Sequence, residues 1–391
     1  MRSPMIRALM GAAALSLAAG IAAAEPPTIK IGSFLSVTGP AAFLGDPEEK
    51  TLKLYVEKLN KAGGVIGRKL ELVVYDDAGD SDKARTFAKR LIDQDKVDII
   101  IGGTTTGTTM AALPLAEQAG VPFISLAGAV VIVEPVKKWV FKTPHTDRMA
   151  CEKIFADMKA RGIAKIGMIA GAGGFDRSMR QECLKVAGKY GISVVADESY
   201  GAKDSDMTAQ LTKIKGAKPD AIICWGTNPG PAVVARNRAQ LGLATPLYMS
   251  HGVASKKFIE LAGAAAEGLI LPAGRLVAPA QVPDGHPQKA LLTKYVADYT
   301  KKFGNPPSTF GGHAYDALAL VISAVKAGKS AKPQDIRDNL EKITGWWGTA
   351  GKFNFSAADH NGPSPSTAPT GHTHSTCDMS PRAQRYPPST Q

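Results

Sequence analysis

The pattern of apolar positions switches repeatedly between strand spacing and helix spacing. Residues 28–34 and 70–75 are short, mainly apolar segments typical of strands, and residues 97–101 (VDIII) form an apolar run typical of a buried parallel strand. Between these segments, apolar residues recur at helix spacing in residues 52–59 and 84–94. This order of strand, helix and strand predicts an α/β sheet with crossover helices.

The same alternation restarts near residue 165 and predicts a second series of elements. Strands are predicted at residues 165–170, 192–196, 221–225 and 246–249, with helices between them at residues 177–190, 207–215 and 231–241. Residues 287–343 then return to helical patterning, with helices predicted at 290–303, 313–326 and 333–343. Two series of similar length predict two lobes of the same design.

The N-terminal segment has the pattern of an export signal. Arg2 and Arg7 form a short basic region, residues 8–23 form an apolar run, and Ala24 ends a stretch of small residues. This order predicts a signal peptide over residues 1–24, and therefore export to the periplasm. A membrane anchor is disfavoured because the run is shorter than the ~20 residues that span a bilayer.

The C-terminal segment changes composition abruptly. Residues 363–391 consist mainly of Pro, Ser, Thr and His, with almost no aliphatic side chains. Such a segment buries too little apolar surface to offset the entropy of ordering, so a disordered tail is predicted. An aberrant terminus, for example one produced by a frameshift, is the alternative hypothesis.

Charge argues against nucleic acid as a partner. The formal charge of the chain is +12, and removal of the two arginines in residues 1–24 lowers it to 12 − 2 = +10. The lysines are spread at helix-surface spacing with acids between them, and no basic run interleaves with aromatic residues. A solvated surface is the better interpretation.

The four cysteines form no CxxC motif, so no zinc or redox site is predicted. Cys151 and Cys183 both fall on predicted helices, and export would permit a disulfide between them. Spacing does not decide whether they meet, and buried free thiols are the favoured interpretation. There is also no GxSxG elbow, HExxH motif or P-loop. We therefore predict no catalytic residues, no metal and no cofactor, and a protein that is not an enzyme.

Loops rich in Gly, Ser and Thr follow the predicted strands. Ligands of open parallel sheets bind at the carboxyl ends of the strands, where such loops converge. Hydroxyl groups and the N–H groups at helix N-termini suit a carboxylate. Helix capping is an equal alternative for the threonines, because it is a common role of this residue. The loops are residues 36–45, 102–109 and 125–129 in the first series and 171–175, 226–230 and 250–252 in the second.

Several motifs together resemble one protein family. They are residues 36–40 (SVTGP), 60–67 (NKAGGVIG), 75–77 (YDD), 102–103 (GG), 121–125 (VPFIS) and 313–317 (HAYDA). With these motifs the chain, from about residue 29 to 362, resembles the branched-chain amino-acid type of periplasmic binding protein, the type I solute-binding family of ABC transporters.

The resemblance implies two doubly wound α/β lobes, joined by a three-strand hinge, with a ligand cleft between them. It places lobe 1 at residues 25–146 plus 276–353 and lobe 2 at residues 147–275 plus 354–362. Closure of the lobes on the ligand would be the functional motion. The implied partners are a small-molecule carboxylate or amino acid and the ABC permease subunits in the inner membrane, with the binding protein acting as a monomer.

The resemblance also implies site residues. Thr106 matches the hydroxyl that holds the ligand carboxylate, Ala127 the carbonyl that receives the amine, and Phe175 a lid aromatic. Two positions depart from the family pattern, since Ala129 replaces a threonine and His251 replaces the acid that pairs with the ligand ammonium. The predicted ligand-binding set is Phe43, Leu44, Thr105, Thr106, Ala127, Ala129, Phe175, Thr227, Asn228 and His251.

The replacement at His251 bears on the ligand. A desolvated ammonium without a carboxylate partner costs several kcal/mol, so we predict a carboxylate without an α-amine, an aromatic or short organic acid. Residues 138–144 also resemble subgroups of the family that are associated with aromatic-acid uptake. The alternatives are a branched-chain amino-acid binding protein and a ligand-sensing module that signals to a membrane receptor.

Overall fold

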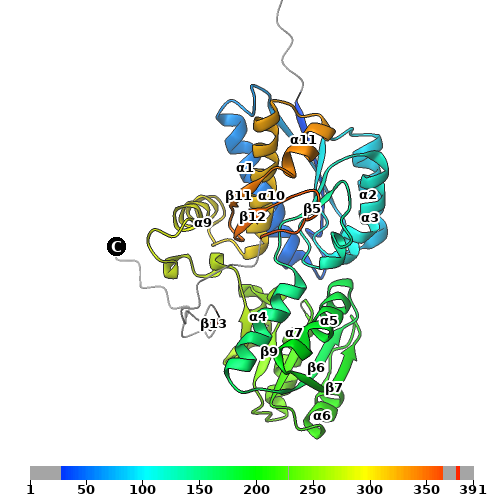
Figure 1. Cartoon of the computed structure of the whole chain (residues 1–391), viewed down its shortest axis with the longest axis vertical. Coiled ribbons are helices and arrows are strands. Elements are labelled where there is room, and N and C mark those ends of the chain that lie inside the picture. The colour runs from blue at the N-terminus through cyan, green and yellow to red at the C-terminus, as the bar shows by residue number, and fades with distance from the viewer. Residues whose placement is uncertain (1–27, 228, 364–375, 379–391) are drawn as a thin grey trace, which may run out of the picture.

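The chain forms two lobes, each built on a parallel sheet, in a computed structural model that describes residues 28–227, 229–363 and 376–378 (Figure 1). Lobe 1 holds the strand order β2-β1-β3-β4-β5, and every neighbouring pair in it is parallel. Its strands are β1 (Ile29–Leu35), β2 (Leu70–Asp76), β3 (Ile99–Gly102), β4 (Phe123–Ser125) and β5 (Val140–Lys142). Its helices are α1 (Ala42–Lys61), α2 (Ser81–Asp93), α3 (Thr106–Ala119), α10 (Thr309–Gly328) and α11 (Pro333–Leu340).

Both faces of this sheet are buried. Ile99 and Ile101 pack in one core with residues of α1 and α10, whereas Ile100 packs in a second core with residues of α2 and α3. Side chains of a strand point alternately to opposite faces, so a strand covered on both sides has no polar positions. This explains the continuous apolar run at residues 99–101, which follows Asp98 at the entry to the strand.

Lobe 2 holds the strand order β13-β10-β9-β8-β6-β7, in which only the edge strand β13 is antiparallel within the described residues. Its strands are β6 (Lys165–Gly171), β7 (Ser193–Tyr200), β8 (Ala221–Trp225), β9 (Leu247–Met249), β10 (Ile270–Pro272) and β13 (Thr376–Asp378). Its helices are α4 (Asp147–Ala160), α5 (Gly174–Ala187), α6 (Thr208–Gly216), α7 (Gly230–Gln240) and α8 (Lys256–Ala262). The predicted two-lobed α/β fold is confirmed.

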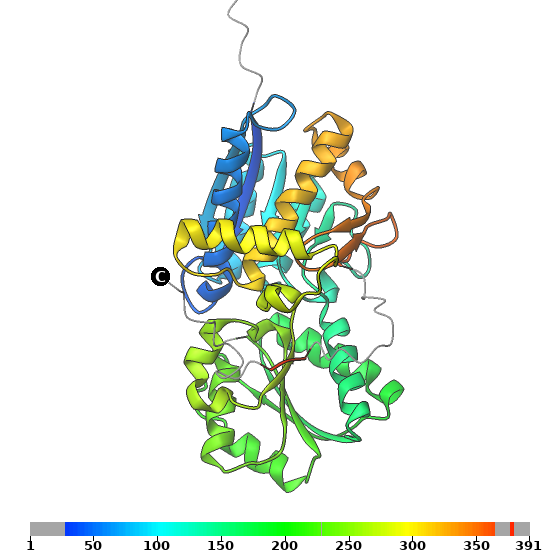
Figure 2. The ribbon, with the colours of Figure 1, turned by 90° about the vertical axis from the view of Figure 1, so that its left-hand side faces the viewer.

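Two further elements cover lobe 1. Helix α9 (Lys289–Phe303) packs on α1, with Leu292 and Tyr295 in one cluster with Leu54, and it crosses lobe 1 in Figure 2. A hairpin of β11 (Thr344–Trp347) and β12 (Lys352–Asn354) follows α11. Short 3₁₀ helices lie at Val130–Ile132, Gly188–Tyr190, His251–Val253, Gly263–Ala266, Arg275–Val277 and Pro279–Gln281. Among the described residues, no helix is long and apolar enough to cross a membrane.

The placement of residues 354–362 in lobe 2 is wrong. Phe355 lies in the core of lobe 1, and the ring of His360 stacks on Phe141 of β5 with 3.9 Å between ring centroids. His360 Nδ1 also lies 2.9 Å from the carbonyl oxygen of Val140. After β12 the chain therefore returns along the edge of the lobe 1 sheet, because this edge offers an apolar surface and a free backbone carbonyl.

The structure tests the predictions for the two ends of the chain to different extents. The predicted signal peptide lies outside the described residues. Within the predicted disordered tail, Thr376–Asp378 forms β13 and pairs with β10 of lobe 2, so for these three residues the structure departs from the prediction. The edge of β10 offers unpaired backbone groups, which a polar segment can satisfy as well as an apolar one. The rest of the predicted tail after Pro363 is outside the described residues.

Cys151 and Cys183 form a disulfide, and the interpretation as free thiols is wrong for this pair. Their Cα atoms are 5.2 Å apart, within the usual range for a disulfide, because α4 and α5 share one core beside the lobe 2 sheet. Cys224 of β8 is a buried free thiol, as expected.

We expect replacement of both Cys151 and Cys183 by Ala to lower the free energy of unfolding by about 2–4 kcal/mol, because the disulfide reduces the conformational entropy of the unfolded chain. Urea unfolding followed by tryptophan fluorescence measures the change. A reductant should lower the free energy of unfolding of the wild type and leave that of the double variant unchanged. Superimposable unfolding curves of the two proteins would contradict this expectation.

Candidate ligand-binding cleft

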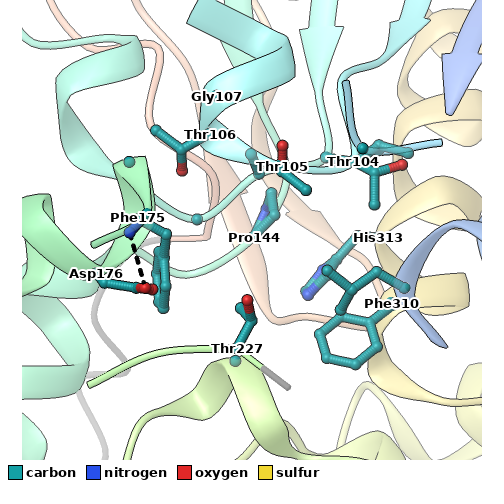
Figure 3. A pocket seen from close by; sticks show the side chains of 18 of the residues that line it. Thr104, Thr105, Thr106, Gly107, Pro144, Phe175, Asp176, Thr227, Phe310 and His313 are labelled. Atoms are coloured by element: carbon teal, nitrogen blue, oxygen red, sulfur yellow. Dashed lines mark hydrogen bonds between the residues drawn. The ribbon is translucent and has the colours of Figure 1, made fainter. Parts of the chain in front are cut away.

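A cavity of about 320 Å³ lies between the two lobes, at the carboxyl ends of the strands (Figure 3). This volume is in the range of small-molecule sites. Lobe 1 lines it with Leu44, Gly79, Ser81, Thr104, Thr105, Thr106, Gly107, Leu126, Ala127, Gly128, Pro144, Phe310 and His313, and lobe 2 with Gly173, Gly174, Phe175, Asp176, Thr227, His251 and Gly252.

The structure brings most of the predicted site residues to this cavity. The seven that line it are Leu44, Thr105, Thr106, Ala127, Phe175, Thr227 and His251. Phe43 does not line it and instead packs edge-on against Phe310, with ring centroids 5.8 Å apart. Ala129 is fully buried in the core of lobe 1, in the cluster that also contains residues of α2 and α3. Asn228 is outside the described residues.

The first turn of α3 presents a polar surface to the cavity. Thr105 caps the helix: its Oγ1 accepts a hydrogen bond from the Thr108 N–H at 3.2 Å, and Thr108 Oγ1 accepts one from the Thr105 N–H. Capping is therefore the structural role of Thr105. Thr104 is also engaged, since its hydroxyl donates to Glu48 at 2.6 Å.

Thr106 differs from these two threonines. It is only 3% exposed, and its Oγ1 has no hydrogen-bond partner among the described residues. Figure 3 shows its hydroxyl pointing into the cavity, with the Thr227 hydroxyl of lobe 2 pointing in from the other side. A buried hydroxyl without a partner is costly, so this group is suited to a ligand atom.

Imidazole rings form a second polar region. His251 begins the 3₁₀ helix after β9, His313 lies on α10, and His145 lies in the segment that crosses between the lobes. The Nδ1 atoms of His251 and His313 are buried and have no hydrogen-bond partner in the described part of the chain. Figure 3 shows the His313 ring beside Phe310, turned into the cavity.

Burial makes these imidazoles neutral. It lowers the pKa of His145 to about 4 and that of His251 to about 3, and it holds the pKa of His313 well below its ordinary value. The positive charge of Lys142 lowers all three pKa values further. Lys142 is itself fully buried, with its Nζ donating to the Pro144 carbonyl at 2.7 Å, and burial lowers its pKa to about 7.

The lobes meet closely at Gly128. A Cβ atom at this position would lie 3.1 Å from both His251 Nε2 and Phe175 Cε2, both in lobe 2. The rings of Phe175 and His251 contact each other edge to face at 5.4 Å. A larger residue at position 128 would push these rings away, so glycine permits the close approach of the lobes.

One carboxyl group lies among the described lining residues, that of Asp176. Its Oδ2 accepts a hydrogen bond from the Gly173 N–H at 3.1 Å at the start of α5. Burial raises the pKa of Asp176 to about 6. This carboxyl is therefore already used in the local structure of lobe 2.

The sequence interpretation missed several lining residues, including Gly128, Asp176, Phe310 and His313. Phe310 and His313 lie on α10 and not in a loop after a strand, so a search of strand-end loops does not find them. The motif at residues 313–317 is the signal that would have included His313.

Comparison with known proteins decides the family. Residues 28–368 match the family model described as periplasmic binding protein. The chain belongs to this family. Members of the family are periplasmic, and they bind small ligands for ABC transport.

The binding protein is similar to characterised and solved relatives over most of its length. It is 29% identical to the leucine-, isoleucine-, valine-, threonine- and alanine-binding protein of Pseudomonas aeruginosa, over 86% of each chain. An extracellular ligand-binding receptor from Rhodopseudomonas palustris HaA2 superposes with a TM-score of 0.81 at 28% identity, covering 86% of this chain and 95% of that one. A solute-binding protein of an ABC transporter from Rhodopseudomonas palustris BisB5, in complex with 3,4-dihydroxybenzoic acid, gives a TM-score of 0.75 at 25% identity, covering 85% and 90%.

The depressed histidine pKa values predict a pH dependence. Between pH 6.5 and about 3, His251 binds a proton in the unfolded chain but not in the folded protein, so its contribution to stability is lost as the pH falls below 6.5. Between pH 8 and pH 5, we expect the wild type to lose about 1–2 kcal/mol more free energy of unfolding than the His251→Gln variant. Urea unfolding at pH 8, 6.5 and 5 measures both profiles, and parallel profiles would rule out the effect.

Proposed function

We propose that this periplasmic binding protein captures a small carboxylate without an α-amine, an aromatic or short organic acid, and delivers it to ABC permease subunits in the inner membrane. Capture occurs by closure of the two lobes, with the protein acting as a monomer and without chemical turnover. The observation that carries the proposal is the Thr106 hydroxyl, which has no hydrogen-bond partner in the described part of the chain and faces a cavity whose other polar region contains neutral imidazoles.

The start of α3 is the side that receives the carboxylate. The first N–H groups of a helix have no partner within the helix, and the helix dipole favours a negative charge there. Gly107 lies in this first turn and lines the cavity beside Thr106. A carboxylate at this position accepts hydrogen bonds from the Thr106 hydroxyl and from backbone N–H groups, so its binding requires no cationic side chain.

An α-ammonium group meets one carboxyl group among the described lining residues, and that group is already engaged. The position predicted from the family pattern to carry an acid is His251, and its ring is neutral. Asp176 supplies the carboxyl group among the described lining residues, and it already accepts from Gly173. A desolvated ammonium without a free carboxylate costs several kcal/mol, so the cavity favours an acid that lacks one.

Two relatives support different ligands. The Rhodopseudomonas palustris BisB5 protein holds an aromatic acid, which supports the proposal. The Pseudomonas aeruginosa relative is named for five amino acids, and Asp176 is the observation that favours this second candidate here. Because burial raises its pKa to about 6, Asp176 is largely ionised at neutral pH and would pair with an ammonium if it turned away from Gly173.

A titration of matched ligands separates the two candidates. We expect benzoates or short aliphatic acids to raise the melting temperature. At a ligand concentration of 100 times the dissociation constant, binding adds about 2.7 kcal/mol to the free energy of unfolding. Leucine, isoleucine and valine should give no shift. Stabilisation by these amino acids alone would overturn the proposed ligand class, and consumption of a bound acid would overturn a pure binding role.

The role of Thr106 has its own test. We expect Thr106→Val to weaken carboxylate binding by roughly 10- to 100-fold, because the variant keeps the shape of the side chain and loses a hydrogen bond to a charged group. Thr212→Val on the exposed face of α6 is the matched control and should bind as the wild type does. Isothermal titration calorimetry gives both affinities, and equal affinities would exclude Thr106 as a ligand contact.

A further inference from the structure

The imidazole region is not needed to hold a carboxylate, and this leaves its role open. His313 is 8% exposed, its Nδ1 has no hydrogen-bond partner among the described residues, and its ring points into the cavity (Figure 3). A buried polar atom without a partner destabilises the protein. A ligand atom that satisfies it would recover this loss.

The hydrogen-bonding character of the rings follows from their surroundings. Neutral imidazole has one N–H donor and one lone-pair acceptor. The backbone of His145 lies beside the ring of His251 and favours the protonated ring, as a carbonyl oxygen near a ring nitrogen does. Nδ1 of His251 has no hydrogen-bond partner among the described residues, and in the tautomer that directs the N–H of the ring at His145 this nitrogen is an acceptor.

The cavity separates this acceptor region from the start of α3. In Figure 3 the Thr106 hydroxyl lies on the side of Phe175, whereas His313 lies on the side of Phe310. Apolar side chains also line the cavity, among them Leu44, Leu126 and Pro144, and Figure 3 shows Pro144 between the two polar regions. A flat ring with a polar group at each end matches this distribution.

We propose that His313 and His251 determine specificity by accepting a hydrogen bond from a ring hydroxyl, so that the protein selects hydroxylated aromatic carboxylates. This inference rests on the proposed function, because it assumes that the carboxylate occupies the start of α3. The hydroxyl donates a hydrogen bond to an imidazole nitrogen, and no covalent bond forms or breaks.

Selection arises from the acids that lack the hydroxyl. An aromatic acid without a hydroxyl group fills the same space but leaves the buried nitrogen without a partner. It therefore binds without the hydrogen bond that a hydroxylated acid forms there. A second carboxylate in place of the hydroxyl cannot donate to the imidazole nitrogen. Protonation of the imidazole would be needed to hold it, and the positive charge of the buried Lys142 opposes this protonation. Dicarboxylates are therefore expected to bind weakly.

The first experiment compares ligands on the wild-type protein by isothermal titration calorimetry. The probes are 3- and 4-hydroxybenzoate, benzoate, 4-fluorobenzoate, which keeps the size and lacks the donor, and terephthalate. We expect at least one hydroxybenzoate to bind tighter than benzoate and 4-fluorobenzoate by about tenfold or more.

The second experiment changes the histidine. His313→Phe keeps a ring of similar size and removes both nitrogens, so the preference for the hydroxybenzoate should fall to within about twofold. His313→Asn retains a polar atom near the position of Nδ1 and should keep part of the preference. His286→Phe, at a histidine outside the cavity lining that contacts Trp347, is the control and should keep the full preference.

The outcomes separate this inference from the function on which it rests. Equal affinities for hydroxylated and unhydroxylated benzoates, preferred binding of terephthalate, or binding of aliphatic acids alone would overturn the inference and leave the proposed function standing. Binding of branched-chain amino acids alone would overturn both. If His313→Phe does not fold, the ligand comparison on the wild type decides the hydroxyl preference, and His313→Asn tests the residue.

Discussion

The carboxyl ends of parallel strands all lie at one edge of a sheet, and the two lobes face each other along these edges. This constraint places the loop after β3, the loop after β6 and the loop after β9 around one cavity, although they are separated by many residues in the sequence. It also brings the N-termini of α3 and α5 to the same space. The chemistry of the cleft therefore comes mainly from hydroxyl groups, backbone N–H groups and ring nitrogens.

Desolvation sets the electrostatics of this space. Three imidazoles and one lysine side chain are buried near one another, and burial lowers the pKa of each, which favours the neutral form. Among the described lining residues, Asp176 therefore carries the ionised side chain of the cleft at neutral pH, and the imidazoles of His251 and His313 are neutral. Hydrogen-bond geometry, together with the helix dipole of α3, then becomes the means of recognising an acid.

The crossing segment after β5 is tied to both lobes. Asp147 accepts a hydrogen bond from the Val130 N–H of lobe 1 at 3.0 Å and also one from the Ser178 hydroxyl of lobe 2. Arg148 pairs with Glu134 of lobe 1 and with Glu182 of lobe 2. His145 in this segment, and Lys142 at the end of β5, are therefore held in register with both walls of the cavity. A relative motion of the lobes would also move the imidazoles.

The sequence by itself determined the local elements and the loops around the site. The apolar run at residues 97–101 identifies a strand buried on both faces, and the Thr-rich loop after it identifies the start of α3. These features depend on contacts between near neighbours in the chain, which leave a periodic signal. Only the tertiary structure decided that Cys151 meets Cys183, that His360 packs on lobe 1, that Ala129 faces the core and that His313 joins the cavity from α10. Such contacts link residues far apart in the sequence, and they depend on how whole helices and lobes pack, for which no local pattern exists.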